Sequence, residues 1–452
     1  MEPTNRLLAP NIYLFAYHLK EQSNSFWQDG DALLSQFTTE TLTEYLDLSS
    51  ANRFLLKDKK DAIYFTFSDY PEISGFAQPL QIQDSHGLFF NIGYDDKAEP
   101  LEAVDFDTIK QLNPHGALLL PEREKFLGQT LLITAYLPPL NQQPDPDYLH
   151  ELANNCYQGL FDDNNPPLSR SGELFGSSIF EYGKSNQTKD YRHVLIWLYR
   201  DKTADEQLNN CLNFFNDLLF YRAKIVKAFA ESRSIYGGLD RGYRKIEQDL
   251  DDLQKMLDNG DASSSDSYLD DFKKELKKLA KESLSYTRLL GKMEEFDKTI
   301  EINLFNYNET INLISGRLGI DKEELSFLEY FGTETAPHFH RQIQADLGYF
   351  QRGIDLISQA IASIRGIVEI DQAKRDRDLE NQIQAVGVGI AAGAIIASTS
   401  GLITQPWSWP SRDRPLLPPH PFIIALVISI VCSLGAWWIV KKWVREGRSE
   451  EI

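Results

Sequence analysis

AKRDRDLENQIQAVGVGIAAGAIIASTSG is the sequence from Ala373 to Gly401, and its character changes halfway. The first half is densely charged, whereas no charged residue occurs from Ala385 to Ile403. The uncharged run, 385–403, is 19 residues long, close to the roughly 20 residues that span a bilayer core. The stretch therefore predicts a charged helix that continues into a first membrane span.

A second apolar segment, FIIALVISIVCSLGAWWIV, occupies residues 422–440 and predicts a second span. Tryptophans and lysines at its end are typical of a membrane interface. Seven basic residues flank the two spans, and two lie in the loop 404–421 between them: Lys374, Arg375, Arg377, Lys441, Lys442, Arg445 and Arg448, against Arg412 and Arg414. The positive-inside rule then predicts an integral, two-span membrane protein with both termini, including the basic tail 441–452, in the cytoplasm.

Small residues recur every four positions along the first predicted span. They are Ala385, Gly389, Gly393, Ala397 and Gly401, and Ser398 and Thr399 lie beside them. Such a stripe lets membrane helices pack closely. In an oligomer these residues would either pack the helices around a pore or line the pore. The simpler alternative is that Gly and Ala are tolerated there. A dinucleotide-binding loop at GVGIAAG is not favoured, because that motif follows a strand and here follows a charged helix.

Apolar residues also recur in an unbroken heptad pattern before the first span. They are Ile343, Leu347, Phe350, Ile354, Ile357, Ile361, Ile364 and Val368. This spacing predicts a coiled-coil stalk helix that packs on another helix. A helix over 338–403 would be about 100 Å long at 1.5 Å per residue. We favour packing between subunits, with packing on the helix's own domain as the alternative.

The remaining chain predicts an α+β protein. Residues 1–202 alternate strand-like runs such as AIYFTFSD with short helical stretches, which indicates a mixed α/β domain in the cytoplasm. Residues 203–337 have apolar residues at helical spacing on both sides of the polar segment DNGDASSSDS, which indicates a helical hairpin. The stalk helix and first span follow at 338–403.

The composition excludes several classes of function. A net charge of −20 argues against a nucleic-acid partner. The three cysteines show no paired spacing, and no GxSxG, HExxH or P-loop motif occurs, so we predict neither an enzyme nor catalytic residues. We predict no cofactor, although the carboxylates of EQDLDDLQKMLDNGD would suit a divalent cation as well as a solvated helix face. His338 and His340, two residues apart, would lie on different faces of a helix, so a surface role is favoured over a metal site.

One further stretch leaves two interpretations open. GELFGSSIFEYG, residues 172–183, places turn glycines around apolar residues. It suits the border of a ligand cleft and a simple β-hairpin equally well.

The order of these parts resembles the CorA family of divalent-cation channels, as does the aromatic and basic ending WWIVKKWVREGR. That resemblance implies a homopentamer whose first span lines the pore, with a Gly-Met-Asn motif that selects magnesium. Here Gly401 is followed by Leu402 and Ile403, and no methionine occurs after Met293. The resemblance therefore implies the fold and topology but not magnesium selectivity.

Two functions follow from the sequence. The first is a CorA-like homo-oligomeric ion channel or transporter of unknown selectivity, gated by its cytoplasmic domain. The second is a membrane-tethered sensor or effector that reads a cytoplasmic small-molecule ligand or partner. In both, the expected partners are the lipid bilayer and further copies of the chain. We favour the channel, because a simple anchor needs neither the stripe nor the stalk.

Overall fold

The computed structural model describes residues 6–50, 52–57, 60–138, 145–161, 166–186, 192–258, 265–400 and 421–446. The chain forms two compact units. The first, which we call the sheet unit, comprises residues 1–245 and 284–354. The second, which we call the helical unit, comprises residues 246–283 and 355–452. Each unit takes parts of the same long helices, so its boundaries differ from the consecutive segments that the sequence indicates.

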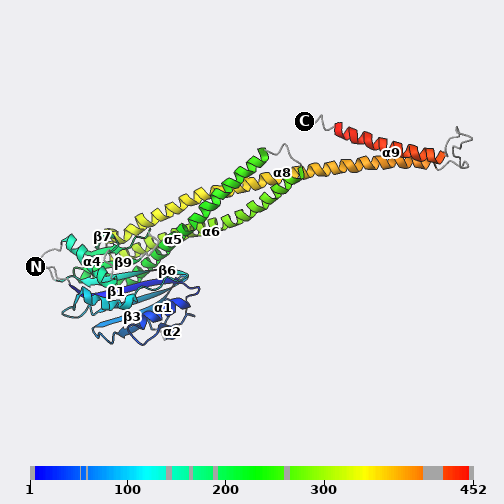
Figure 1. The fold of residues 1–452 in the computed structure, drawn as a ribbon. Coiled ribbons are helices and arrows are strands. Elements are labelled where there is room, and N and C mark those ends of the chain that lie inside the picture. The colour runs from blue at the N-terminus through cyan, green and yellow to red at the C-terminus, as the bar shows by residue number, and fades with distance from the viewer. Residues whose placement is uncertain are drawn as a thin grey trace, which may run out of the picture. The chain divides into compact units, whose positions relative to one another are not determined.

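The sheet unit contains a sheet of nine strands within the described residues, in the order β2-β3-β4-β1-β6-β9-β8-β7, with β5 paired to β1 (Figure 1). The strands are β1 (Arg6–Leu19), β2 (Ile63–Thr66), β3 (Ile73–Ile82), β4 (Ser85–Tyr94), β5 (Ala103–Asp105), β6 (Phe126–Tyr136), β7 (Leu168–Leu174), β8 (Ser177–Tyr182) and β9 (His193–Tyr199). Strands β6 and β9 are parallel, and the other pairs are antiparallel. The predicted mixed α/β character of the N-terminal region is confirmed.

The short helical elements of the sheet unit are α1 (Asn24–Leu34), α2 (Leu42–Tyr45), α3 (Phe106–Ile109), η2 (Lys110–Leu112), η3 (Pro114–Gly116), α4 (Pro146–Phe161), η4 (Lys322–Leu325), α7 (Ser326–Tyr330) and the π-helical turn η5 (Phe331–Thr335). The long helices are α5 (Lys202–Asp258), α6 (Ser265–Leu318) and α8 (Ala336–Ser400), and α9 (Pro421–Glu446) follows them. Helices α5, α6 and α8 each contribute residues to both units.

Strand β1 shows why the middle of the sheet is apolar on both faces. Successive side chains of a strand point to opposite faces. Tyr17 faces α5, where its hydroxyl donates to the backbone carbonyl of Asn216 at 2.8 Å. His18, the next residue, faces α1 and stacks on Phe26 at 5.4 Å between ring centroids. Because helices cover both faces, this strand reads as a nearly continuous hydrophobic run rather than an alternating one.

The hairpin β7–β8 settles the interpretation of the stretch 172–183. Phe175 and Gly176 form its two-residue turn, and both have positive φ, +49° and +71°. Such turns match the twist of the flanking strands, and glycine takes the second position without strain. The stretch is a hairpin, and its strand β8 is buried along its whole length.

A π-helical turn joins α7 to α8. It spans Phe331–Thr335, and its second residue, Gly332, lies against α6. A Cβ atom at Gly332 would be 2.1 Å from the side-chain oxygen of Asn308 and 3.0 Å from the Tyr307 ring. Only glycine allows this approach of the backbone to α6. π-Helical turns are rare and frequently occur at functional sites.

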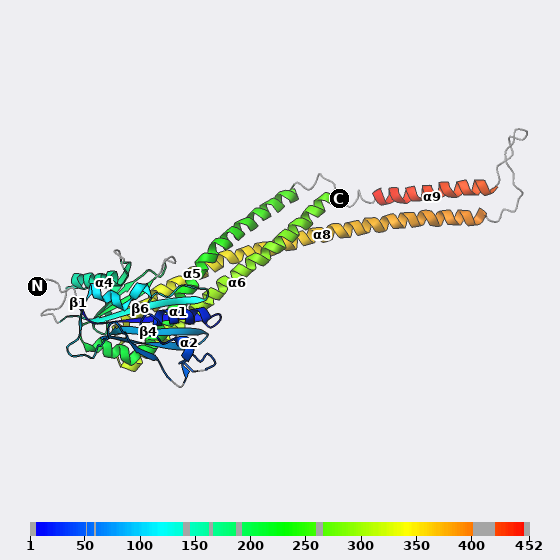
Figure 2. The same cartoon turned by 60° about the horizontal axis from the view of Figure 1, so that its bottom comes forward.

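The core of the helical unit is built from α5, α6 and α8, which run side by side (Figures 1 and 2). Its buried residues are Leu253, Phe272, Leu279, Ala360 and Ile364, with Ile361 and Val368 packed at its edge. The predicted heptad pattern of α8 therefore packs, in this unit, on helices of its own chain.

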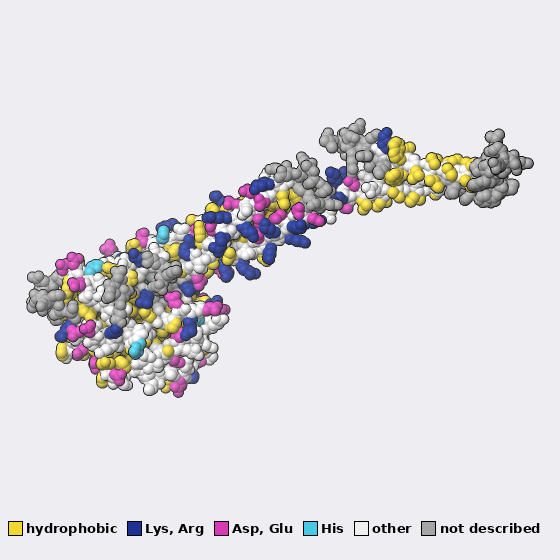
Figure 3. Space-filling model, in the orientation of Figure 1, with side chains coloured by type: hydrophobic (Ala, Val, Ile, Leu, Met, Phe, Trp, Pro, Cys, Tyr) yellow, Lys and Arg dark blue, Asp and Glu magenta, His cyan; other side chains and the backbone are white. Residues whose placement is uncertain are grey.

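Helix α9 packs on the last part of α8 within the helical unit (Figure 2). A Cβ atom at Gly389 would be 3.4 Å from the backbone oxygen of Ser433 and 3.4 Å from Cβ of Trp437. Many apolar side chains of α9 are nevertheless exposed, as Figure 3 shows, and Val431 and Leu434 are at least 60% exposed.

The predicted membrane spans at 385–403 and 422–440 are contradicted. Across the residues that the structure describes, no helix is both long and apolar enough to cross a membrane. The prediction of an integral two-span membrane protein with a transmembrane stalk is therefore wrong for the described chain, which is mixed α/β with a nine-stranded sheet and long helices.

Candidate functional site

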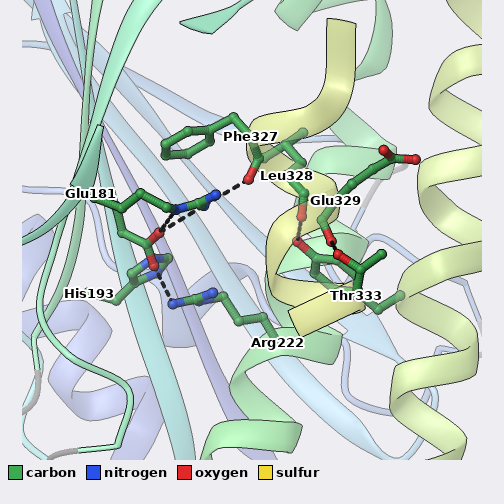
Figure 4. Close-up of polar contacts among 9 residues, drawn as sticks. Glu181, His193, Arg222, Phe327, Leu328, Glu329 and Thr333 are labelled. Carbon is green, nitrogen blue, oxygen red and sulfur yellow. Dashed lines mark hydrogen bonds and ion pairs between the residues drawn. The ribbon is translucent and has the colours of Figure 1, made fainter. Parts of the chain in front are cut away.

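A buried carboxylate, Glu181 of β8, gathers three basic side chains in the sheet unit (Figure 4). Arg222 of α5 donates from Nη2 to its Oε1 at 2.6 Å. Arg170 of β7 donates from Nη2 and Nε to its Oε2 at 3.0 Å and 3.3 Å. The ring Nε2 of His193, on β9, lies 3.4 Å from Oε1. Three consecutive strands and helix α5 thus meet at one carboxylate.

Aromatic rings of α7 and η5 hold the two guanidinium groups in place. Arg170 lies 4.1 Å from the ring centroid of Phe327 and 4.4 Å from that of Tyr330. It also donates to the backbone carbonyl of Phe327 at 2.7 Å. Arg222 lies 4.2 Å from the ring centroid of Phe331. Cation–π contacts of this kind are worth about 2 kcal/mol when they are shielded from water.

The network fixes the charges of its members. Burial alone would raise the pKa of Glu181, but the positive charges of Arg222 and Arg170 outweigh it and hold that pKa well below its usual range. Burial lowers the pKa of His193 to about 4, and the charge of Arg222 acts in the same direction. At neutral pH the cluster therefore contains one carboxylate, two guanidinium groups and a neutral imidazole, so that it carries an excess positive charge.

This excess positive charge borders a cavity of about 580 Å³, which we call the basic pocket. Its lining comes from the hairpin β7–β8 and the loop after it, from α5, and from the segment Tyr330–Arg341. The charged residues that line it are Arg170, Lys184, Arg222 and Arg341, against Glu181 and Glu334. Four positive and two negative side chains leave a net charge of +2 in a chain whose overall charge is −20.

The rim of the basic pocket is the part open to a ligand. Lys184 and Arg341 are exposed there, and within the described part of the chain neither makes an ion pair. His338 and the aromatic ring of Tyr330 lie beside them in the lining, also exposed. The pocket thus combines a preorganised floor, formed by the buried Arg222 and the half-buried Arg170, with two solvated cations at its edge.

The contact between Thr130 and His193 raises the question of catalysis. The hydroxyl of Thr130 lies 2.8 Å from Nδ1 of His193, whose Nε2 faces Glu181, so the order is hydroxyl, imidazole, carboxylate. That order resembles a nucleophile with its base. However, the pKa of His193 near 4 makes the imidazole a weak base at neutral pH, and Thr130 is 3% exposed on the middle strand β6. The contact is better explained as hydrogen-bond satisfaction of two buried groups.

The predicted stalk residues are only partly buried. Ile343, Phe350, Ile357 and Ile364 are buried, whereas Leu347, Ile354, Ile361 and Val368 are half-buried. The buried half packs within the chain, as the core of the helical unit shows for Ile364. Packing between copies of the chain stays a prediction.

The small-residue stripe divides in the same way. Ala385 is 5% exposed, and Gly389 packs closely against α9, so these two pack helix against helix. Gly393 is half-buried. Ala397, Ser398 and Thr399 belong to α8, but their side chains, like Gly401, lie outside the described residues.

Neither of the sequence-based metal candidates forms a cluster. His338 is exposed at the basic pocket, whereas Nε2 of His340 points elsewhere and lies 3.1 Å from Asp297. In the acidic run of α5, Asp249 is buried and accepts a hydrogen bond from Lys278 at 2.6 Å. Among the described residues no group of three or more His, Cys, Asp or Glu side chains could hold a metal ion. A divalent cation stays a prediction.

Sequence analysis did not identify the arginines and lysine of the basic pocket. The signal that marks them is a charged residue inside an otherwise apolar run: Glu181 within SSIFEY and Arg222 within LLFYRAKIV. A charge in a buried strand or helix face requires a partner of opposite charge. That rule predicts a pairing but not which residues pair.

No family model matches this chain, and no curated protein matches it. The site is therefore interpreted from its own geometry, and the resemblance to CorA-like channels stays a prediction.

Proposed function

We propose that the sheet unit is a receptor for a small phosphate-bearing anion, which it binds in the basic pocket. The observation that carries the proposal is the net positive charge of this pocket in a strongly acidic chain. Surface charge scattered at random in such a chain would make most concavities negative. A concave site with the opposite sign focuses the field and concentrates anions.

The chemistry of the lining suits an oxyanion such as phosphate. Guanidinium groups present several N–H donors in a planar fork, which matches the oxygens of phosphate or carboxylate. Arg170 and Arg222 are already oriented by Glu181 and by their aromatic neighbours, so little side-chain entropy is lost on binding. A volume of about 580 Å³ falls in the range of ordinary small-molecule sites.

The position of the pocket supports a role as a sensor. Its lining includes residues of the π-helical turn and of the first turns of α8, the 65-residue helix that continues to Ser400. A ligand that contacts Thr335 and Arg341 would therefore bias the start of this helix. This retains the ligand-reading part of the second function inferred from the sequence. Ion conduction is not proposed, because it required the membrane spans that are contradicted. Self-association remains a separate prediction, for native mass spectrometry to test.

Calorimetric titration of the full chain with pyrophosphate tests the proposal. Arg341→Ala and Lys184→Ala each remove one exposed cation from the rim, and Arg288→Ala removes an equally exposed arginine from α6 outside the pocket. A unit charge about 5 Å from the ligand contributes about 0.8 kcal/mol per unit of ligand charge in water, and screening at about 0.1 M salt reduces this to about 0.5 kcal/mol. We expect each rim variant to weaken binding about 3- to 30-fold and the α6 variant to leave it unchanged. Absence of millimolar binding by the unmodified chain, or equal losses in all three variants, would refute the proposal.

A further inference from the structure

A second, smaller cavity adjoins the basic pocket. Its volume is about 120 Å³, and it lies between the start of β6 and the middle of α5, entirely within the sheet unit. The two cavities share the side chains of Ser185 and Arg222 as lining. A molecule bound at the guanidinium of Arg222 is therefore within reach of both.

More than half of the wall area of the smaller cavity is apolar, and the charged side chains of Glu122 and Lys227 also line it. Its apolar lining consists of Phe126, Leu127, Gly128, Ala223, Val226 and Ala230. A Cβ atom at Gly128 would lie 3.5 Å from Cβ of Ala223, which is ordinary van der Waals contact. Glycine is suited to this position because its φ is +144°, and the absence of a side chain leaves space between strand and helix.

Three polar side chains on the sheet side of this cavity are already hydrogen-bonded within the protein. The amide of Gln129 accepts from the backbone N–H of Leu120 and donates to its carbonyl, at 3.0 Å and 3.1 Å. Thr130 and His193 are bonded to each other at 2.8 Å. Since a polar ligand group would have to displace these bonds, the cavity favours an apolar one.

We infer that the ligand has two parts: a phosphate monoester group in the basic pocket and a ring-sized apolar group in the smaller cavity. The inference rests on the proposed anion-binding function. A dry cavity of about 150 Å³ accommodates benzene, so a cavity of about 120 Å³ suits an aromatic or short aliphatic group of nearly that size. Ser185 and Arg222 lie where the two parts of the ligand join.

The test compares methyl phosphate with phenyl phosphate at about pH 8, where both are dianions, by calorimetric titration of the full chain. The inference predicts that phenyl phosphate binds at least tenfold more tightly. Ala230→Leu fills the smaller cavity, and Ser234→Leu adds the same side chain at an exposed position one turn further along α5. We expect Ala230→Leu to abolish the preference for the phenyl ester and leave methyl phosphate binding unchanged, and Ser234→Leu to change neither.

The outcomes separate the two proposals. If neither ester nor pyrophosphate binds, the anion-binding function itself is refuted. If both esters bind with equal affinity, the anion site stands and the two-part ligand is refuted. The same conclusion follows if Ala230→Leu lowers the affinities for both esters together while its thermal unfolding matches that of Ser234→Leu. A preference for the phenyl ester that Ala230→Leu removes supports both.

Discussion

Replacing Glu181 with Gln should destabilise the sheet unit strongly. The substitution keeps the size of the side chain but removes the charge that faces Arg222 at 2.6 Å and Arg170 at 3.0 Å. The Glu181 side chain is only 9% exposed, so the two guanidinium groups lose the carboxylate that they share with little access to replacement water. Breaking a buried ion pair from one side costs about 3–5 kcal/mol. At 1.36 kcal/mol per tenfold change, this corresponds to about two to four orders of magnitude in the opening equilibrium.

Hydrogen exchange measured by mass spectrometry can follow this loss in the sheet unit alone, through peptides from β8 and β9. The matched control is Glu173→Gln on the same hairpin. Glu173 also pairs with an arginine, Arg200, at 3.0 Å, but its side chain is 63% exposed, and such pairs contribute about 0–1 kcal/mol. We expect protection in β8 and β9 to fall by at least a hundredfold in Glu181→Gln and by less than tenfold in the control. Similar protection in the two variants would show that the network does not hold these strands together.

Two further results are expected. His193 has a pKa of about 4 in the folded protein, whereas an unfolded histidine takes up its proton near pH 6.5. Folding stability should therefore fall as the pH drops from 6.5 to 4, by up to about 1.4 kcal/mol per pH unit. Urea titrations should show a shallower pH dependence of stability for His193→Gln, and an unchanged dependence would contradict the buried neutral state. Gly389→Ile should separate α9 from α8 and speed hydrogen exchange in α9. Gly387→Ile is the control and should not, because a Cβ atom at Gly387 meets no atom within 4 Å. Equal exchange rates in the two variants would argue against close helix packing at Gly389.

The long helices were the most predictable part of the fold, because helix periodicity is a local property of the sequence. The stalk was predicted from residue 338, and α8 begins at Ala336. The heptad pattern also identified the buried face, on which Ile343, Phe350, Ile357 and Ile364 lie. What covers that face could not be read from the pattern, since a seam of apolar residues looks the same whether its partner belongs to the same chain or to another.

The membrane prediction failed on a related ambiguity. A hydropathy pattern treats every apolar side chain as facing lipid, but apolar residues can equally face a neighbouring helix. Ala385 and Gly389 are buried, and Gly389 packs against Ser433 and Trp437 of α9. Val431 and Leu434 of α9 are exposed, but within the described residues no helix is both long and apolar enough to cross a membrane.

The basic pocket could not be predicted, because its residues become neighbours only through the order of strands in the sheet. Arg170 and Glu181 face each other because β7 pairs with β8, and the parallel pairing of β6 with β9 brings His193 beside Thr130. Arg222 arrives from α5. Sequence analysis left open whether the hairpin that carries Glu181 borders a ligand cleft, and the other borders of the basic pocket come from α5 and from the segment Tyr330–Arg341.

The network that stabilises the hairpin would also suit the proposed anion. One carboxylate contacts two guanidinium groups, so these three charges sum to +1 at the floor of the pocket. A purely structural ion pair would need only one arginine, and the second costs desolvation free energy in the folded protein. Aromatic rings lower that cost without neutralising the charge. Binding an anion would then complete the charge balance, so Glu181→Gln, wherever the fold survives it, should bind pyrophosphate more tightly than the unmodified chain. Weaker binding by that variant at temperatures where it remains folded would show that the loss of arginine orientation outweighs the gain in positive charge.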